Sequence, residues 1–224
     1  MNANSSGSSL AAESASESQG RDSEAEITLG VLNAVERSDR VTQRSVAGEL
    51  GIALGLANAY LRRCVKKGYI KVTQAPANRY LYYLTPTGFA EKSRLTARYL
   101  SISFNFFRAA RRQLAELIDQ CAARGWTRIA LAGNGDLVEI ASLCVGDRPL
   151  EIVGVIETGA AVGPFAGMTV VPDLDRLGPV DAVIITDIGN PQATFDALVA
   201  RMPADRVLAP RFLNISRQQP NLVE

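Results

Sequence analysis

Residues 42–68, TQRSVAGELGIALGLANAYLRRCVKKG, contain two helical patterns separated by only a few residues. Thr42 is a favourable N-cap for the first pattern, QRSVAGEL, which stops at Gly51. The second pattern, ALGLANAYLRRCVKKG, follows almost at once and ends at Gly68. Two helices joined by a tight glycine turn predict a helix-turn-helix, whose second helix can lie in the major groove of DNA.

On its outer face, the second helix is predicted to carry small residues near its start and basic residues toward its end. Small residues let a helix approach base edges closely, Asn58 suits an adenine edge, and Arg62 suits guanine or a phosphate. The residues expected to face inward at helical spacing are Ala57, Leu61, Cys64 and Val65. The predicted DNA-contacting residues of the two helices are Thr42, Gln43, Arg44, Gly55, Asn58, Ala59, Arg62, Arg63 and Lys66.

Segments on either side complete a winged helix-turn-helix domain, predicted at residues 23–88. The stretch at 24–39, EAEITLGVLNAVERSD, has one apolar face at helical spacing. YIKVTQ at 69–74 and RYLYYLT at 79–85 predict two short strands around the tip APAN, closed by TPTG. This hairpin is the wing, from which Lys71, Asn78 and Arg79 are expected to touch phosphates or the minor groove.

Charge is distributed unevenly along the chain. Residues 41–112 hold 13 Lys/Arg against two Glu, a net charge of +11. From residue 126 to the end there are 7 Arg and 12 Asp/Glu, a net charge of −5. This asymmetry predicts that the front half binds a polyanion, here a double-stranded DNA operator. The alternative is a protein-interaction module whose charges form a solvated face.

The stretch at 42–72 together with LTPTGFAEKSRLTARYL at 84–100 resembles the winged helix-turn-helix domains of bacterial MarR-type transcriptional regulators, especially those associated with exopolysaccharide clusters. The glycine turn, the basic helix end, the GYI strand start and the LTPTG closure occur in order over residues 25–105. The resemblance implies a DNA-binding regulator that forms a homodimer through helices outside the DNA reader. Ala53, Leu54 and Leu56 depart from the Ser, Thr or Lys common there, which leaves open which bases are read.

Residues 89–125 are predicted to form a helical connector. No proline follows Pro86 in this stretch, but the centre at 101–107, SISFNFF, is weak in helix propensity, so two helices with a break are also expected. Its aromatic and aliphatic side chains exceed what a lone connector can hide. The segment 89–124 is therefore predicted to be the homodimer interface; the alternative is packing on its own two domains.

The acidic half alternates strand and helix patterns. TRIALAG, EIVGVIE, DAVIITD and RVLAP read as strands, and NGDLVEIASLCV and PQATFDALVARM as helices. FAGMTVVPDLDRL predicts a short strand with a turn or helix after it. The order predicts a small Rossmann-like parallel-sheet domain at 126–214 and a C-terminal tail at 215–224. It resembles, over 126–212, the nucleotide-binding domains of the CoA-binding and sugar-acyltransferase amino-terminal type.

Ligand-binding residues are predicted at the ends of these strands. Glycines in LAGNGD would let backbone amides approach a phosphate, and Glu157 stands 22 residues after Gly135, where an acid bonds a ribose hydroxyl. Val138 replaces the third glycine of a dinucleotide site, so a mononucleotide, a nucleotide sugar or another small anion is the expected effector. The TDIGN stretch at 186–190 is either part of this site or a helix entry. The predicted ligand-binding residues are Gly133, Asn134, Gly135, Asp136, Glu157, Thr186, Asp187 and Asn190.

Composition argues against most enzymes. The chain has no histidine, which removes the usual general base and the commonest zinc ligand, and its three cysteines are too widely spaced for a metal or redox pair. We expect no catalytic residue, no metal and no firmly bound cofactor. The alternatives are a nucleotide-dependent sugar-modifying enzyme, and a Rossmann-like half that serves only in oligomerisation.

The first 22 residues are predicted to be a disordered tail, because they carry almost no large apolar side chain. They have neither the basic start nor the apolar centre of a secretory signal, and no run of about 20 apolar residues follows. A cytoplasmic protein without a membrane partner is therefore expected.

Overall fold

A computed structural model describes residues 6–75 and 79–217. The chain forms two compact units that divide between Ser103 and Phe104, within one helix. We call them the winged-helix unit and the α/β unit. Among the helices of the described residues, none is both long and apolar enough to cross a membrane.

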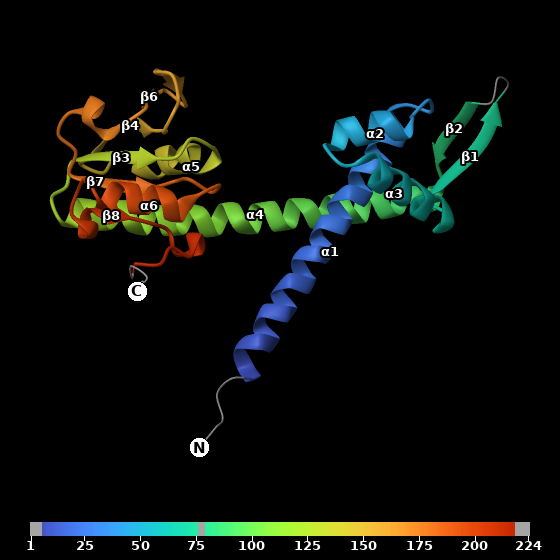
Figure 1. Ribbon diagram of the computed structural model, residues 1–224, viewed down its shortest axis with the longest axis horizontal. Coiled ribbons are helices and arrows are strands. Elements are labelled where there is room, and N and C mark those ends of the chain that lie inside the picture. Colours follow the sequence, from blue (N-terminus) through green and yellow to red (C-terminus); the bar gives the residue numbers. More distant parts are fainter. Residues whose placement is uncertain (1–5, 76–78, 218–224) are drawn as a thin grey trace, which may run out of the picture. The chain divides into compact units, whose positions relative to one another are not determined.

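The winged-helix unit packs three helices, the start of a fourth and a hairpin around one core, in agreement with the predicted fold class (Figure 1). Val31 and Leu32 of the first helix, Val46 of the second and Leu61 of the third are buried together. The antiparallel hairpin pairs Ile70 with Leu84. The elements are α1 (Ser6–Arg37), α2 (Gln43–Leu50), α3 (Leu54–Lys66), β1 (Ile70–Ala75), β2 (Arg79–Leu84) and the start of α4 (Pro86–Ala123).

The TPTG closure holds the wing to the helices. The Thr85 hydroxyl donates to the Gly68 carbonyl (2.6 Å) and accepts the Gly88 N–H (3.0 Å), so it caps the start of α4. A Cβ at Gly88 would lie 2.1 Å from the Tyr69 carbonyl oxygen, so only glycine fits. These contacts explain why this sequence closes the unit.

The α/β unit has a six-stranded sheet in the order β5-β6-β4-β3-β7-β8. Neighbouring strands are parallel except the β5–β6 pair at the edge. This confirms the predicted Rossmann-like fold class. The elements are β3 (Arg128–Ala132), α5 (Asp136–Val145), β4 (Glu151–Ile156), β5 (Gly163–Phe165), β6 (Met168–Val171), η1 (Leu174–Leu177), β7 (Ala182–Ile185), α6 (Pro191–Val199), η2 (Ala204–Arg206), β8 (Val207–Leu208) and η3 (Arg211–Leu213).

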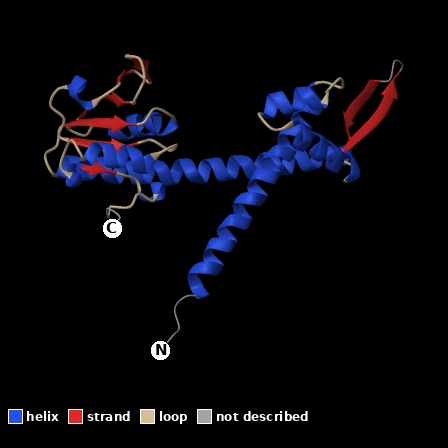
Figure 2. Cartoon of the chain, in the orientation of Figure 1, coloured by secondary structure: helices blue, strands red, loops and turns tan. Residues whose placement is uncertain are grey.

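Helices cover both faces of this sheet (Figure 2). One core cluster joins the sheet to α5 and to the carboxyl-terminal part of α4, through residues such as Leu114 and Ile118. A second cluster joins the opposite face to α6 through Phe195 and Leu198. Because β6, β4, β3, β7 and β8 are parallel, their carboxyl ends lie at the same end of the sheet.

Two sequence predictions differ from the structure. Residues 6–22 of the predicted disordered tail belong to α1, and their alanines and glutamates have high helix propensity. The connector is helical, as predicted, but it lacks the expected break: it is one helix, α4, whose ends are held in two cores by Leu95 and by Leu114. Within the predicted tail at 215–224, the Ser216 N–H donates to the Gln192 side chain (2.8 Å); residues 218–224 lie outside the description.

Candidate nucleic-acid interface and effector crevice

The third helix, α3, presents the predicted outer face. Ala57, Leu61 and Cys64 are buried beneath it, and burial raises the pKa of the Cys64 thiol to about 11. Val65 is 36% exposed, so its predicted inward position is wrong, and Tyr60 is buried instead. The predicted outward residues are exposed or half-buried, namely Gly55, Asn58, Ala59, Arg62 and Lys66.

Ion pairs divide the cations of this unit into two groups. On α1 and α4, Lys92 pairs with Glu36, and Arg98 donates to Asp22 at 2.6 Å. Other basic side chains are exposed and form no ion pair within residues 6–75 and 79–217. These unpaired cations are Arg40, Arg44, Arg62, Lys66, Lys67 and Lys71.

Arg63, a predicted DNA contact, lies in the paired group. Its guanidinium donates to Glu24 of α1 at 3.0 Å and lies 5.9 Å from the centre of the Tyr60 ring. This hydrogen bond, with the attraction of the two charges, lowers the pKa of Glu24. The pattern of charges in the sequence could not show this, because the partners are 39 residues apart.

The start of α2 and the wing also carry predicted DNA contacts. The Thr42 hydroxyl accepts the Ser45 N–H (3.0 Å), so this predicted contact residue is a helix cap. Gln43, Arg44 and Lys71 are exposed. Arg79 begins β2, and Asn78 lies outside the described residues. Lys67 is an unpaired cation that the predicted DNA contacts did not include. Its position beside Lys66, at the basic end of the helix, was the signal available in the sequence.

A second candidate site is a crevice in the α/β unit. It holds about 140 Å³ at the carboxyl ends of β3, β4, β6 and β7. Of the predicted ligand residues, Gly133, Glu157 and Asp187 line it, whereas Asn134, Gly135, Asp136, Thr186 and Asn190 do not. Lining residues that sequence reasoning missed include Asp173, Thr194 and Arg201.

The predicted phosphate turn is tied down by its neighbours. The Asn134 N–H donates to Glu157 Oε2 at 2.7 Å, so a carboxylate uses an amide that a phosphate would need. The buried Thr186 hydroxyl donates to the carbonyls of Ala132 (3.0 Å) and Gly133 (2.7 Å). Both contacts hold the carboxyl end of β3 in place.

Asp187 organises the entry of α6. One carboxylate oxygen accepts the N–H groups of Gly189 (2.8 Å) and Asn190 (3.0 Å), and the other accepts the Thr194 hydroxyl (2.6 Å). Burial alone would raise the pKa of Asp187, but these hydrogen bonds outweigh it and lower the pKa. These hydrogen bonds agree with the interpretation of TDIGN as the entry to a helix.

Charge in the crevice is mostly negative. Glu157, Asp173 and Asp187 line it, and the single lining cation, Arg201, pairs with Asp175. Within the described residues, no group of three or more His, Cys, Asp or Glu side chains is arranged to hold a metal ion. The crevice thus offers hydrogen-bond acceptors more readily than phosphate-binding donors.

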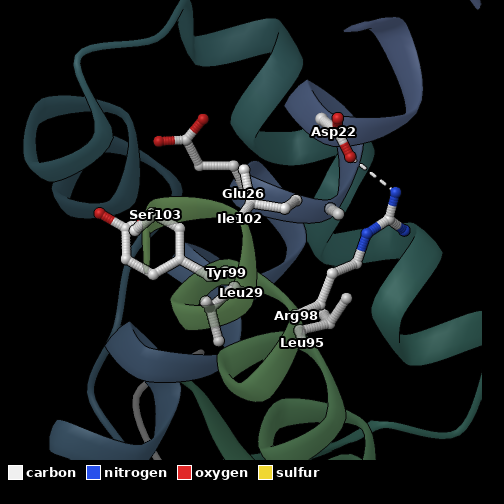
Figure 3. Close-up of a pocket in the computed structure, with 9 residues that line it drawn as sticks. Asp22, Glu26, Leu29, Leu95, Arg98, Tyr99, Ile102 and Ser103 are labelled. Atoms are coloured by element: carbon white, nitrogen blue, oxygen red, sulfur yellow. Dashed lines mark hydrogen bonds and ion pairs between the residues drawn. The ribbon is translucent and has the colours of Figure 1, made fainter. Parts of the chain in front are cut away.

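A third hollow, of about 150 Å³, lies in the winged-helix unit between α1 and α4 (Figure 3). Leu29, Leu95, Tyr99 and Ile102 give it an apolar lining, and the Asp22–Arg98 ion pair stands at one side. Tyr99 and Ile102 are also about half exposed. This hollow adjoins the apolar surface of α4.

Fold and charge together define a class, a winged helix-turn-helix protein with an attached α/β domain. A family model described as winged helix-turn-helix DNA-binding matches residues 24–71. The chain therefore contains a winged helix-turn-helix DNA-binding domain. A search of curated proteins found no match.

Solved structures show limited similarity. A mutant of MepR from S. aureus, bound to an oligodeoxyribonucleotide, is 17% identical, with 46% of this chain and 83% of that chain covered and a TM-score of 0.32. Human N-acetylserotonin methyltransferase in complex with SAM is 12% identical, with coverages of 93% and 81% and a TM-score of 0.34. PigF with SAH is 13% identical, with coverages of 92% and 61% and a TM-score of 0.23. At these scores the likenesses establish no function for this chain.

Proposed function

We propose that this protein is a transcriptional regulator whose winged helix reads an operator in double-stranded DNA. One observation carries the proposal: within the winged-helix unit, α2, α3 and the wing carry basic side chains that have no ionic partner among the described residues, while Arg37 of α1 and Lys92, Arg94 and Arg98 of α4 are paired. Unpaired cations can neutralise phosphates without first breaking an internal ion pair. The resemblance to MarR-type regulators supports the same function.

A mobility-shift assay of the full chain with the DNA upstream of its own gene tests this proposal. We expect a complex at low salt and an affinity that falls steeply as salt is raised, because each phosphate contact releases counterions. Arg62→Ala should weaken binding and reduce the slope of log affinity against log salt by about 0.9 for one lost phosphate contact.

Arg94→Ala is the matched control, because it removes the same charge from an arginine that already hydrogen-bonds Glu91 at 2.8 Å. It should leave the salt slope unchanged. Absence of a complex at low salt, or an equal loss in both variants, would contradict the assignment of the DNA-binding face.

We also propose that the regulator is a homodimer joined through residues 89–124. The support is the set of exposed apolar side chains on α4, among which Tyr99 is 52% exposed and Phe104 58%. Two winged helices would then meet two half-sites of an inverted-repeat operator. The expected result of disrupting this surface is given in the Discussion.

We propose that the crevice of the α/β unit senses a nucleotide or nucleotide-sugar effector and carries out no reaction. Open parallel sheets bind ligands at the carboxyl ends of their strands, where this crevice lies. Within the described residues, only Oε2 of Glu157 is hydrogen-bonded, which leaves Oε1 to accept a sugar hydroxyl. Asp187 is committed to the entry of α6, which favours a structural role over proton transfer.

A thermal-shift panel of ATP, UDP, UDP-glucose and NAD tests the sensor. A ligand at 100 times its Kd should stabilise the fold by about 2.7 kcal/mol, and Glu157→Ala should reduce the shift. If none of the four raises the melting temperature at millimolar concentration, the oligomerisation role of the α/β unit is favoured.

A further inference from the structure

The start of α3 carries two leucines that the winged-helix core does not use. Leu54 is 48% exposed and Leu56 is 41% exposed, and neither belongs to the buried cluster of the unit. A single exposed leucine needs no explanation. Two exposed leucines within three residues, at the start of the helix proposed to enter the DNA groove, do need an explanation.

Helical spacing places Leu54 in line with the polar residues of the outer face. At 3.6 residues per turn, side chains four residues apart form one row. Leu54, Asn58, Arg62 and Lys66 form such a row along α3, with the apolar member first. Leu56 lies on the other flank, seven residues before Arg63.

DNA offers partners for both the apolar and the basic side chains of this helix. The one apolar group on a base edge in the major groove is the C5-methyl of thymine, and the amino-terminal residues of a recognition helix contact base edges. Arg44 of α2 and Arg62 and Lys66 of α3 are exposed and without ion pairs in the described part of the chain. Their charge fits phosphates that flank the bases.

We propose that Leu54 and Leu56 determine sequence specificity by packing against thymine methyl groups, so that the operator half-site has thymines opposite the start of α3. The proposal rests on the proposed DNA-binding function and adds the class of bases that are read. Next to Leu54 in the row, Asn58 is suited to adenine through two hydrogen bonds. A half-site rich in A·T pairs is therefore expected.

Deoxyuridine substitution isolates the methyl group, because uracil pairs like thymine and lacks only the C5-methyl. The full chain is used to select duplexes from a random-sequence pool, and each thymine of the selected site is then replaced in turn by deoxyuridine. Burial of one methyl corresponds to about a fourfold change in affinity. We expect at least one position per half-site to weaken binding by about this factor.

Variants assign that methyl to a side chain. Leu54→Ala and Leu56→Ala should each bind the thymine duplex about fourfold or more weakly, and each should lose the response to deoxyuridine at its own position. Alanine is a good helix former, so α3 is expected to persist, which circular dichroism checks. Leu143→Ala, at a 66% exposed leucine of α5, is the control and should behave as the wild type.

Failure of the inference can be told from failure of the proposed function. Absence of any DNA complex at low salt contradicts both. A complex whose affinity is unchanged by every deoxyuridine, or is changed equally in the wild type and both leucine variants, overturns the role of the leucines and leaves DNA binding in place. Selection without any enriched sequence overturns it as well.

Discussion

At the scale of single residues, the two glycines of LAGNGD have different physical roles. Gly133 is buried with a φ of +105°, and a Cβ there would lie 2.4 Å from both the backbone nitrogen and the Cα of Asp187. Gly135 has a φ of 162°, which is extended backbone, and a Cβ there would meet nothing within 4 Å. One motif therefore contains a packing glycine and an open one.

This difference predicts unequal effects of substitution by alanine. Gly133→Ala should destabilise the α/β unit by about 2–4 kcal/mol, because the new methyl requires backbone movement in a left-handed conformation. Gly135→Ala should change stability by less than about 0.5 kcal/mol. Urea unfolding followed by the fluorescence of Trp126, the sole tryptophan, measures both. Equal effects would show that the close approach to Asp187 is not what requires glycine.

Residue types at strand ends could be predicted from the sequence, but their partners could not. Glu157 was expected at the end of its strand, and it directly follows β4, which ends at Ile156. Its bond to the Asn134 N–H joins residues 23 apart, and the Arg63 bond to Glu24 joins residues 39 apart. Such choices depend on how the elements pack, and periodicity contains no information on packing partners.

At the scale of elements, boundaries set by local chemistry were predictable. The bounds of α2 follow from the Thr42 cap and the left-handed Gly51, both read from the sequence. The extents of α1 and α4 were not predictable, because helix propensity is weak and neighbouring structure decides whether a helix continues. The low-propensity centre of α4 remains helical because both flanks are packed, at Leu95 and at Leu114.

The cap of α4 gives a prediction at this scale. Thr85→Ala removes the group that accepts the Gly88 N–H and donates to Gly68, and should cost about 1–2 kcal/mol of stability. Thr85→Ser keeps the hydroxyl and should recover most of that loss. Thr96→Ala is the control, since the Thr96 hydroxyl bonds only the Lys92 carbonyl within the same helix (2.9 Å). Circular dichroism during urea unfolding measures all three; an equal loss in the control would exclude the capping explanation.

At the scale of the whole molecule, DNA recognition and self-association are expected to be linked through α4. A dimer presents two winged helices, so one operator with two half-sites gains contacts that a monomer cannot make. The apolar residues of α4 differ in how much of their surface already packs against other residues of the chain. Phe106 packs edge-to-face on Phe212 with ring centres 5.5 Å apart, whereas Phe104 is 58% exposed. A change at Phe104 should therefore disturb the α/β core less than a change at Phe106.

Phe104→Glu should convert the dimer to a monomer, because a carboxylate buried in an apolar interface loses its hydration without gaining a partner. Light scattering coupled to size exclusion should give two chains for the wild type and one for the variant. Operator affinity should fall with the loss of the second half-site, while binding to a single half-site should be retained. Leu143→Glu, at an exposed leucine outside α4, should remain dimeric. A monomeric wild type would refute the dimer, and a dimeric Phe104→Glu would place its interface elsewhere on the chain.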